Sequence, residues 1–208
     1  MRAILIDWLV EVHMKFRLSP ETLYLCVHML DRYCSEERVP RAKLQLVGVT
    51  ALFLATKHEE IYPPEVRDCV YITDRAYDRQ EVLDMEQKIL KALNWKISMP
   101  TAYPFLDRFL SMTKASELTQ HAAHYYMERT LQEHDLLEYR PSMVAAASVI
   151  LALNNPGICK AEVDYYRVLP GLVRYPFEDI LSCKPSLVLG SNNLFFLYLS
   201  LTTCSRKS

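Results

Sequence analysis

A cluster of ionisable side chains follows the most apolar stretch of this 208-residue chain. Residues 44–56 carry no charge, and Lys57, His58, Glu59 and Glu60 come directly after them. A histidine beside two carboxylates has the groups that acid–base chemistry needs. Because neither a nucleophile pattern nor a glycine-rich cofactor loop accompanies the cluster, we interpret it as the charged end of a buried helix and as a candidate recognition site.

A second set of residues offers metal chemistry. His121, His124 and Glu128 share one face of a predicted helix, and such a face can supply metal ligands. The sequence suggests no fourth ligand. We therefore interpret these residues as surface side chains and predict no metal site.

The composition argues against several function classes. Half of the residues are hydrophobic and the formal net charge is -1, which gives no support to nucleic-acid or membrane-surface binding through bulk charge. No apolar run reaches the ~18 residues of a membrane span, and we find no secretory leader. Because the four glycines are dispersed, we expect no phosphate-cradling loop and no cofactor. The six scattered cysteines favour reduced thiols in a protein of the nucleus and cytoplasm.

Helical periodicity and helix-start signals predict an all-α protein. Residues 1–96 should form a bundle of five helices, over residues 1–16, 20–35, 41–60, 64–71 and 78–93. Ser19, Pro20 and Glu21 provide an N-cap, a first-turn proline and a first-turn acid. Asp78 and Glu81 form a capping box. The third helix is apolar on nearly every side, which is typical of a helix surrounded by others.

The pattern then begins again. Residues 101–112, 116–139 and 141–154 read as three further helices, and the last is small, apolar and nearly uncharged like the central helix of the first bundle. Shifting Arg41 by 99 residues gives Arg140. This weak internal repeat indicates a second bundle of the same type, which we place at residues 97–183.

Glu86 lies within an apolar helical stripe formed with Val82, Ile89, Leu90 and Leu93. A carboxylate in such a setting costs free energy unless it is paired or faces a partner. One interpretation is a glutamate at the edge of the stripe that reaches solvent or pairs internally with a lysine. The other joins Glu86 to Lys57 as a polar site for another protein.

Several separated segments carry a resemblance to a known family. The chain resembles the N-terminal cyclin box of the mitotic A/B-type cyclins in MRAILIDWLVEV, DRY at residues 31–33, KLQLVG, ATKHEEIYPPE, YITD and MEQKIL. It resembles the second box in TLQEHDLLEYRPSMVAAAS. The resemblance implies two consecutive five-helix cyclin boxes in a non-catalytic subunit that activates a cyclin-dependent kinase.

The resemblance assigns roles to individual residues. Lys57 and Glu86 match residues that face the regulatory C helix of the kinase in cyclins, and Phe53 and Ile89 are expected to add apolar contact. Arg2 and Asp31 match an internal ion pair that joins the first two helices. We therefore expect kinase binding from Lys57, Glu86, Phe53 and Ile89. The pair of Arg2 and Asp31 should be structural.

A docking groove follows from the same match. The cyclin surface that binds Arg-x-Leu motifs of substrates or inhibitors corresponds to Met1, Ile4, Leu5, Trp8, Glu11, Arg41, Leu44 and Gln45. Trp8 and Leu44 would form the apolar slot and Gln45 would bind peptide backbone, while Glu11 would pair with the arginine. Leu5 should be mostly structural. Periodicity cannot distinguish a core stripe from a groove, and without the resemblance we would favour core positions for the apolar members.

The C-terminal segment departs from the family. From residue 184 the sequence loses amphipathic spacing and contains the apolar run LFFLYLSL, so we treat residues 184–208 as a divergent tail and leave open whether the second bundle is complete. Two alternatives to the activator remain from the sequence. One is a cyclin-box transcriptional scaffold of the general-factor type, which the lack of a basic surface disfavours. The other is a helical enzyme, which the absence of a catalytic constellation disfavours.

Overall fold

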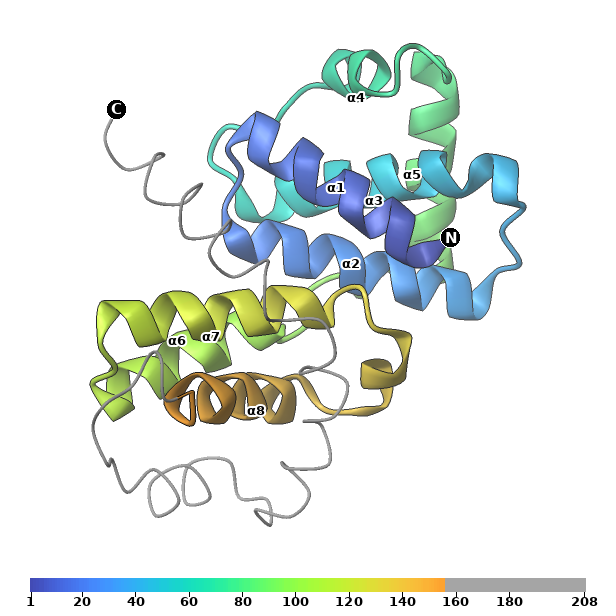
Figure 1. Cartoon of the computed structure of the whole chain (residues 1–208). Coiled ribbons are helices and arrows are strands. Elements are labelled where there is room, and N and C mark those ends of the chain that lie inside the picture. Colours follow the sequence, from blue (N-terminus) through green and yellow to red (C-terminus); the bar gives the residue numbers. More distant parts are fainter. Residues whose placement is uncertain (156–208) are drawn as a thin grey trace. The chain divides into compact units, whose positions relative to one another are not determined.

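The computed structural model describes residues 1–155, and every regular element within this range is helical (Figure 1). The prediction of an all-α protein is confirmed for these residues. The chain divides into two compact units, and the second begins at Ala102, a few residues after the predicted boundary. The divergent tail predicted at residues 184–208 and the end of the predicted second bundle lie outside the described range.

The first unit contains the predicted five α-helices and one short 3-10 turn. They are α1 (Arg2–Phe16), α2 (Pro20–Glu36), η1 (Arg41–Lys43), α3 (Leu44–Glu59), α4 (Val66–Ile72) and α5 (Arg79–Ala92). Pro20 opens α2 and the capping box of Asp78 and Glu81 opens α5, as the sequence predicts. Helix α4 begins slightly later than predicted, because Glu65 and Asp68 form a second capping box.

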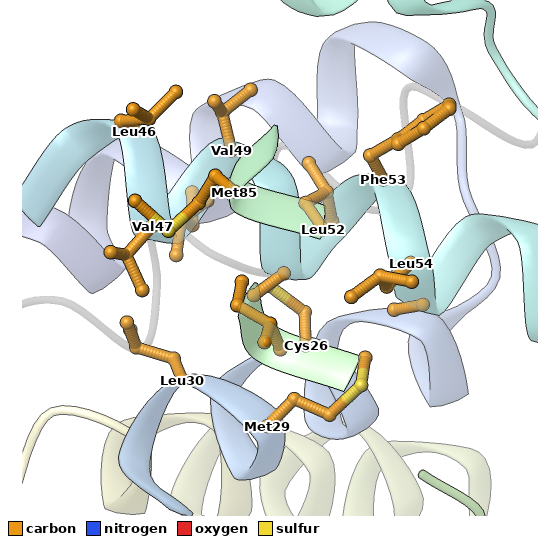
Figure 2. Close-up of a cluster of buried hydrophobic side chains, with 14 of the residues drawn as sticks. Cys26, Met29, Leu30, Leu46, Val47, Val49, Leu52, Phe53, Leu54 and Met85 are labelled. Carbon is orange, nitrogen blue, oxygen red and sulfur yellow. The ribbon is translucent and has the colours of Figure 1, made fainter. Parts of the chain in front are cut away.

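Helix α3 is the centre of this unit. Every residue from Leu46 to Thr56 is buried, and the helix packs against α1, α2, α4 and α5. Figure 2 shows part of the core, where Met29 of α2, Leu52 of α3 and Met85 of α5 belong to one cluster of apolar side chains. A helix enclosed in this way needs no polar face, which explains the uncharged stretch in the sequence.

Gly48 permits a close approach of α1 to α3. A Cβ atom added at Gly48 would lie 2.9 Å from Cδ1 of Leu5. The missing side chain therefore lets Leu5 settle against the backbone of α3. Helices α1 and α3, which carry most of the predicted docking residues, are therefore in direct contact.

The second unit, as far as it is described, contains three α-helices and a 3-10 helix. They are α6 (Ala102–Thr113), α7 (Glu117–Thr130), η2 (His134–Glu138) and α8 (Pro141–Leu153). Helix α8 packs on α6 and α7 and is nearly as enclosed as α3. The predicted helix over residues 116–139 is too long. It stops at Thr130 because the chain turns there and buries Leu131 and Leu136.

Candidate functional site

The structure brings together Lys57 and Glu86, two residues predicted to form one site. Lys57 lies in the last turn of α3 and Glu86 lies in α5, and their side chains form an ion pair. The Lys57 side chain is 42% exposed, whereas that of Glu86 is only 12% exposed. Lys57 Nζ also lies 4.4 Å from the ring centroid of Phe53. The internal-pair interpretation of Glu86 is thus confirmed, and a partner-facing role stays a prediction.

The paired glutamate retains capacity for a further bond. Its Oε1 atom, which is next to Lys57 Nζ, accepts no aligned hydrogen bond within the described residues. Because Oε1 is buried beside Lys57, an N–H group of a partner would have to reach the other carboxylate oxygen, Oε2. The exposed ammonium of Lys57 can likewise donate to backbone carbonyls.

The two apolar residues predicted beside this pair are buried. Phe53 is 5% exposed and its ring supports the Lys57 ammonium, so its direct contact with a partner stays a prediction. Ile89 is fully buried in the core, and the expectation that its side chain contacts a partner is wrong for this structure. The half-buried Leu90 lies four residues after Glu86, on the same helix face.

Three large apolar side chains near the ends of α3 and α5 were missed by sequence reasoning. Ile61 and Tyr62 follow α3 and are 86% and 91% exposed, and Trp95 follows α5 and is 68% exposed. Singly exposed apolar residues are common on protein surfaces. Here, however, they flank the two helices that carry Lys57 and Glu86, where an apolar contact surface was expected.

The predicted docking residues on α1 are accessible. Met1 and Ile4 are 56% and 68% exposed, so the interpretation of all apolar members as core is wrong for these two. Trp8 is half-buried and Glu11 is exposed. Leu5 is buried, which confirms its mainly structural role.

The remaining docking residues lie at the start of α3. Arg41 in η1 is exposed, and Leu44 and Gln45 in the first turn of α3 are half-buried. Helices α1 and α3 pack against each other. Apolar, acidic and amide groups are therefore available on neighbouring elements, and their binding to a peptide stays a prediction.

The predicted ion pair between the first two helices is present. Arg2 Nε and Nη2 donate to Asp31 Oδ1 and Oδ2 over 2.6 Å and 2.8 Å. This two-bond geometry fits the planar guanidinium to the carboxylate. The structural assignment of Arg2 and Asp31 is confirmed, since the pair joins α1 to α2.

The other members of the charged cluster have separate partners. His58 Nδ1 lies 2.8 Å from Glu59 Oε1 at the surface. Glu60 turns toward the start of α2, where its Oε1 accepts from Ser19 N at 2.7 Å and from Thr22 Oγ1 at 2.6 Å. The sequence cluster is therefore not one acid–base centre.

Comparison with known proteins assigns the family. The family descriptions "Cyclin, N-terminal domain" and "Cyclin, C-terminal domain" match residues 1–98 and 100–188. Cyclin-B1-3 of Arabidopsis thaliana is 51% identical over 152 residues, which cover 73% of this chain and 37% of the relative. The G2/mitotic-specific cyclin S13-7 of Glycine max is 47% identical over 206 residues, covering 95% and 78%. The chain belongs to the mitotic B-type cyclins. The resemblance seen in the sequence is confirmed.

This cyclin spans only part of several relatives. It covers 37% of Cyclin-B1-3 and 41% of Cyclin-B1-2 of Arabidopsis thaliana. Among solved structures, a viral cyclin from herpesvirus saimiri superposes with a TM-score of 0.79 at 19% identity, covering 95% of this chain and 86% of that one. The yeast RNA Pol II CTD kinase CTDK-1 complex contains a chain with a TM-score of 0.74 at 13% identity, covering 98% and 75%. At these identities the likeness supports the fold.

The candidate metal ligands of the cyclin do not gather into a site in the structure. Within residues 1–155, no three side chains of His, Cys, Asp or Glu lie close enough to hold a metal ion. His124 Nε2 is instead 3.9 Å from Asp107 Oδ1. No helix in the same part of the cyclin is long and apolar enough to cross a membrane.

Three cysteines of the cyclin are described, and all are free thiols. Cys26 and Cys69 are buried and Cys34 is exposed. Burial raises the pKa of the Cys69 thiol to about 12, with a smaller contribution from the charge of Asp68. A thiol with so high a pKa is a poor nucleophile, so Cys69 serves packing rather than chemistry.

Proposed function

We propose that this cyclin binds and allosterically activates a cyclin-dependent Ser/Thr protein kinase and thereby controls progression through G2 and mitosis. Family membership supports a regulatory role. Related folds occur in kinase assemblies, including the yeast CTD kinase complex. The observation that carries the proposal is the exposed Lys57 ammonium paired with the recessed Glu86, close to half-buried Leu90.

The mechanism follows from the chemistry of this surface. Lys57 would donate to backbone carbonyls of the kinase C helix, Glu86 would accept from its backbone amides, and Leu90 would pack against its apolar face. Holding that helix inward aligns the lysine–glutamate pair of the kinase and orders its activation segment. ATP and the chemical step belong to the kinase, so the cyclin itself would be non-catalytic.

The test uses a purified mitotic cyclin-dependent kinase with a histone-type substrate. The wild-type cyclin should bind and activate the kinase, and the Lys57→Ala/Glu86→Ala double variant should lose both properties. Lys91→Ala, which changes an exposed lysine on the same helix α5, is the matched control. Folding of each variant is checked by circular dichroism. A folded wild-type chain that neither binds nor activates any kinase of this class would overturn the proposal.

We further propose that the α1–α3 surface docks Arg-x-Leu motifs of substrates or inhibitors. The exposed Met1 and Ile4 supply apolar contact, and the exposed carboxylate of Glu11 suits an arginine. A fluorescently labelled Arg-x-Leu peptide should bind the wild type, and Trp8→Ala should weaken its binding at least about tenfold, as expected for a central aromatic contact. Equal binding by a peptide with both motif residues changed to alanine would contradict this proposal.

The same functional assignment leads us to propose that the cyclin acts in the nucleus and cytoplasm, without direct contact to nucleic acid or membrane. The net charge of -1 supports this view, because bulk attraction to phosphate groups is absent. Imaging of the tagged full-length protein through the cell cycle would test it. Binding of the purified chain to DNA would instead favour the general-factor type of scaffold.

A further inference from the structure

The start of α3 lacks the usual means of stabilising a helix N-terminus. Its N-cap residue is Lys43, which makes no side-chain capping bond, and the first turn contains no acidic residue. The N–H groups of Lys43 and Leu44 donate instead to the carbonyl oxygens of Pro40 and Arg41, so the order of this first turn depends on η1, which has no side-chain cap of its own. The same turn carries Leu44 and Gln45, and η1 just before it carries Arg41. Accurate placement of these docking residues therefore requires support from elsewhere.

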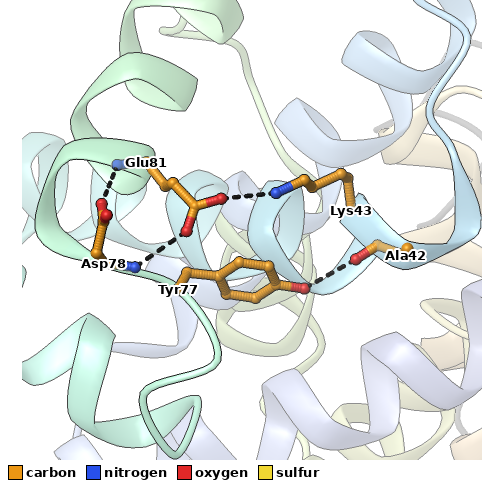
Figure 3. A network of polar contacts seen from close by, with 5 residues as sticks. All are labelled: Ala42, Lys43, Tyr77, Asp78 and Glu81. Atoms are coloured by element: carbon orange, nitrogen blue, oxygen red, sulfur yellow. Dashed lines mark hydrogen bonds and ion pairs between the residues drawn. The ribbon is translucent and has the colours of Figure 1, made fainter.

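That support comes from the segment that opens α5 (Figure 3). The Tyr77 hydroxyl donates to the carbonyl oxygen of Ala42 over 3.0 Å. Lys43 Nζ donates to Glu81 Oε1 over 2.6 Å and lies 5.4 Å from the Tyr77 ring centroid. Two consecutive residues, Ala42 and Lys43, are thus fastened to two residues near the start of α5.

The fastening residues are themselves held in place. Tyr77 is buried, and only 9% of it is exposed. Glu81 also belongs to the capping box of α5, in which its Oε2 accepts from Asp78 N at 3.1 Å. Because Glu81 is bound on both oxygens, it presents a fixed anion to Lys43 rather than a freely rotating one.

The charge states agree with this geometry. The hydrogen bond from Lys43 lowers the pKa of Glu81, and the hydrogen bond to Glu81 raises the pKa of Lys43. Both groups are therefore charged at neutral pH. The pair is exposed to solvent, so its contribution lies in orientation more than in global stability.

We propose that Tyr77 and Glu81 are positioning residues for substrate docking, because they hold η1 and the first turn of α3 and so fix Arg41, Leu44 and Gln45 in the arrangement that receives an Arg-x-Leu motif. This inference rests on the docking function proposed above. It adds two residues that would not touch the peptide themselves.

The experiment uses the complex of the full chain with its kinase and two substrates that differ only in the motif, Arg-x-Leu in one and Ala-x-Ala in the other. Tyr77→Phe removes the hydroxyl donor alone, and Lys43→Met removes the ion pair. Each should raise KM for the motif-bearing substrate roughly three- to tenfold, the range expected for one hydrogen bond that supports binding. The kcat value and all parameters for the Ala-x-Ala substrate should stay unchanged.

Three further variants make the result specific. Lys43→Arg keeps a cation facing Glu81 and should retain the wild-type KM. Trp8→Ala, within the proposed groove, is the positive control, and Lys91→Met on the outer surface of α5 is the negative control. Amide hydrogen exchange at residues 43–45 should be faster in Tyr77→Phe while the α2 core stays protected.

The outcomes separate the two proposals. If Trp8→Ala raises KM but Tyr77→Phe and Lys43→Met do not, the groove exists and the positioning role is wrong. If Trp8→Ala also leaves KM unchanged, the docking function fails, and this inference fails with it. A fall in kcat for both substrates would show general damage to the cyclin and would equally overturn a role confined to docking.

Discussion

At the scale of single residues, Lys57 and Glu86 form an ion pair but differ in their exposure to solvent. Lys57 can reach water from its place in α3, whereas Glu86 is 12% exposed and depends more on its partner. Loss of the cation should therefore be more costly than loss of the anion. Leaving a recessed carboxylate without its partner costs about 1–3 kcal/mol, whereas an exposed lysine loses little.

We therefore predict that Lys57→Met lowers the free energy of unfolding more than Glu86→Gln does. The double variant should be less destabilised than the sum of the two. Urea denaturation of the isolated chain, evaluated as a double-mutant cycle, measures this coupling. Additive effects would mean that the ion pair does not persist in solution and that both side chains are held only by a kinase.

His13 leads to a prediction about pH. Its Nε2 lies 3.0 Å from the Ser19 carbonyl oxygen, and burial lowers the pKa of the imidazole despite opposing effects of Ser19 and Glu60. The folded state thus prefers neutral His13. The stability that this preference provides is present above the ordinary histidine pKa of about 6.5 and is lost as the pH falls toward the lowered value.

His13→Gln keeps an N–H donor for the carbonyl but does not titrate. We expect its free energy of unfolding to depend less steeply on pH than that of the wild type between about pH 5.5 and 7.5, by at most about 1.4 kcal/mol per pH unit. Chemical denaturation across this range measures the difference. Burial also lowers the pKa of His28. Because His28 is present in both proteins, its contribution to the pH dependence cancels in the comparison. Parallel curves would contradict a half-buried His13 that is neutral in the folded state.

At the scale of elements, Glu60 serves the N-terminus of a helix to which it does not belong. The N-cap of α2, Ser19, makes no side-chain capping bond, and Glu60 supplies the acceptor to Ser19 N and to the Thr22 hydroxyl. An anion at this position also complements the helix dipole. Glu60→Ala should cost about 1–2 kcal/mol, the usual effect of losing a cap.

Two control variants are compared with Glu60→Ala. Glu60→Gln retains an oxygen acceptor and should cost less than Glu60→Ala. Glu59→Ala removes the neighbouring acid, whose partner His58 is at the surface, and should change the free energy of unfolding by less than about 0.5 kcal/mol. Thermal or urea unfolding ranks the three variants. Equal destabilisation by Glu59→Ala and Glu60→Ala would show that general charge, rather than capping, is responsible.

The elements also show where sequence reasoning succeeds. Helix starts with local chemistry were predicted, because Pro20 and the capping box of Asp78 and Glu81 act within one turn. The end of α7 was not, since Thr130 is followed by neither glycine nor proline, and burial of Leu131 decides it. Tertiary packing, not a local signal, sets that boundary.

In the candidate site, too, some features could be predicted from the sequence and others depend on tertiary packing. An apolar stripe interrupted by Glu86 indicated that the charge needs compensation, and it left open whether solvent, a lysine or a partner protein supplies it. Choosing between Ile89 and Leu90 required knowledge of which side of α5 faces the core. The bond from Tyr77 to the Ala42 carbonyl could not be predicted, since every residue offers a carbonyl and the sequence does not show which one a tyrosine reaches.

At the scale of the whole molecule, all residues assigned to kinase binding and docking lie in the first unit. This unit extends to Thr101, and the apolar cluster around α3 is formed by buried residues between Leu5 and Leu93, together with partly buried neighbours as far as Ile97. A domain of about 100 residues can bury enough apolar surface to fold without help. Its core is continuous around α3, and both ends of α3 are paired with α5 through Lys43 and Lys57.

We predict that a fragment of residues 1–101 unfolds cooperatively and binds an Arg-x-Leu peptide within about threefold of the affinity of the full chain, since every residue assigned to the groove belongs to the first unit. Fluorescence anisotropy of a labelled peptide, with Trp8→Ala in both lengths of chain as the specificity control, measures the affinities. Kinase activation is a separate readout, because residues beyond Thr101 are free to contribute to it. A fragment that shows native-like unfolding but binds the peptide more than about tenfold weaker would place part of the docking energy outside the first unit, and the groove on α1 and α3 would then be incomplete.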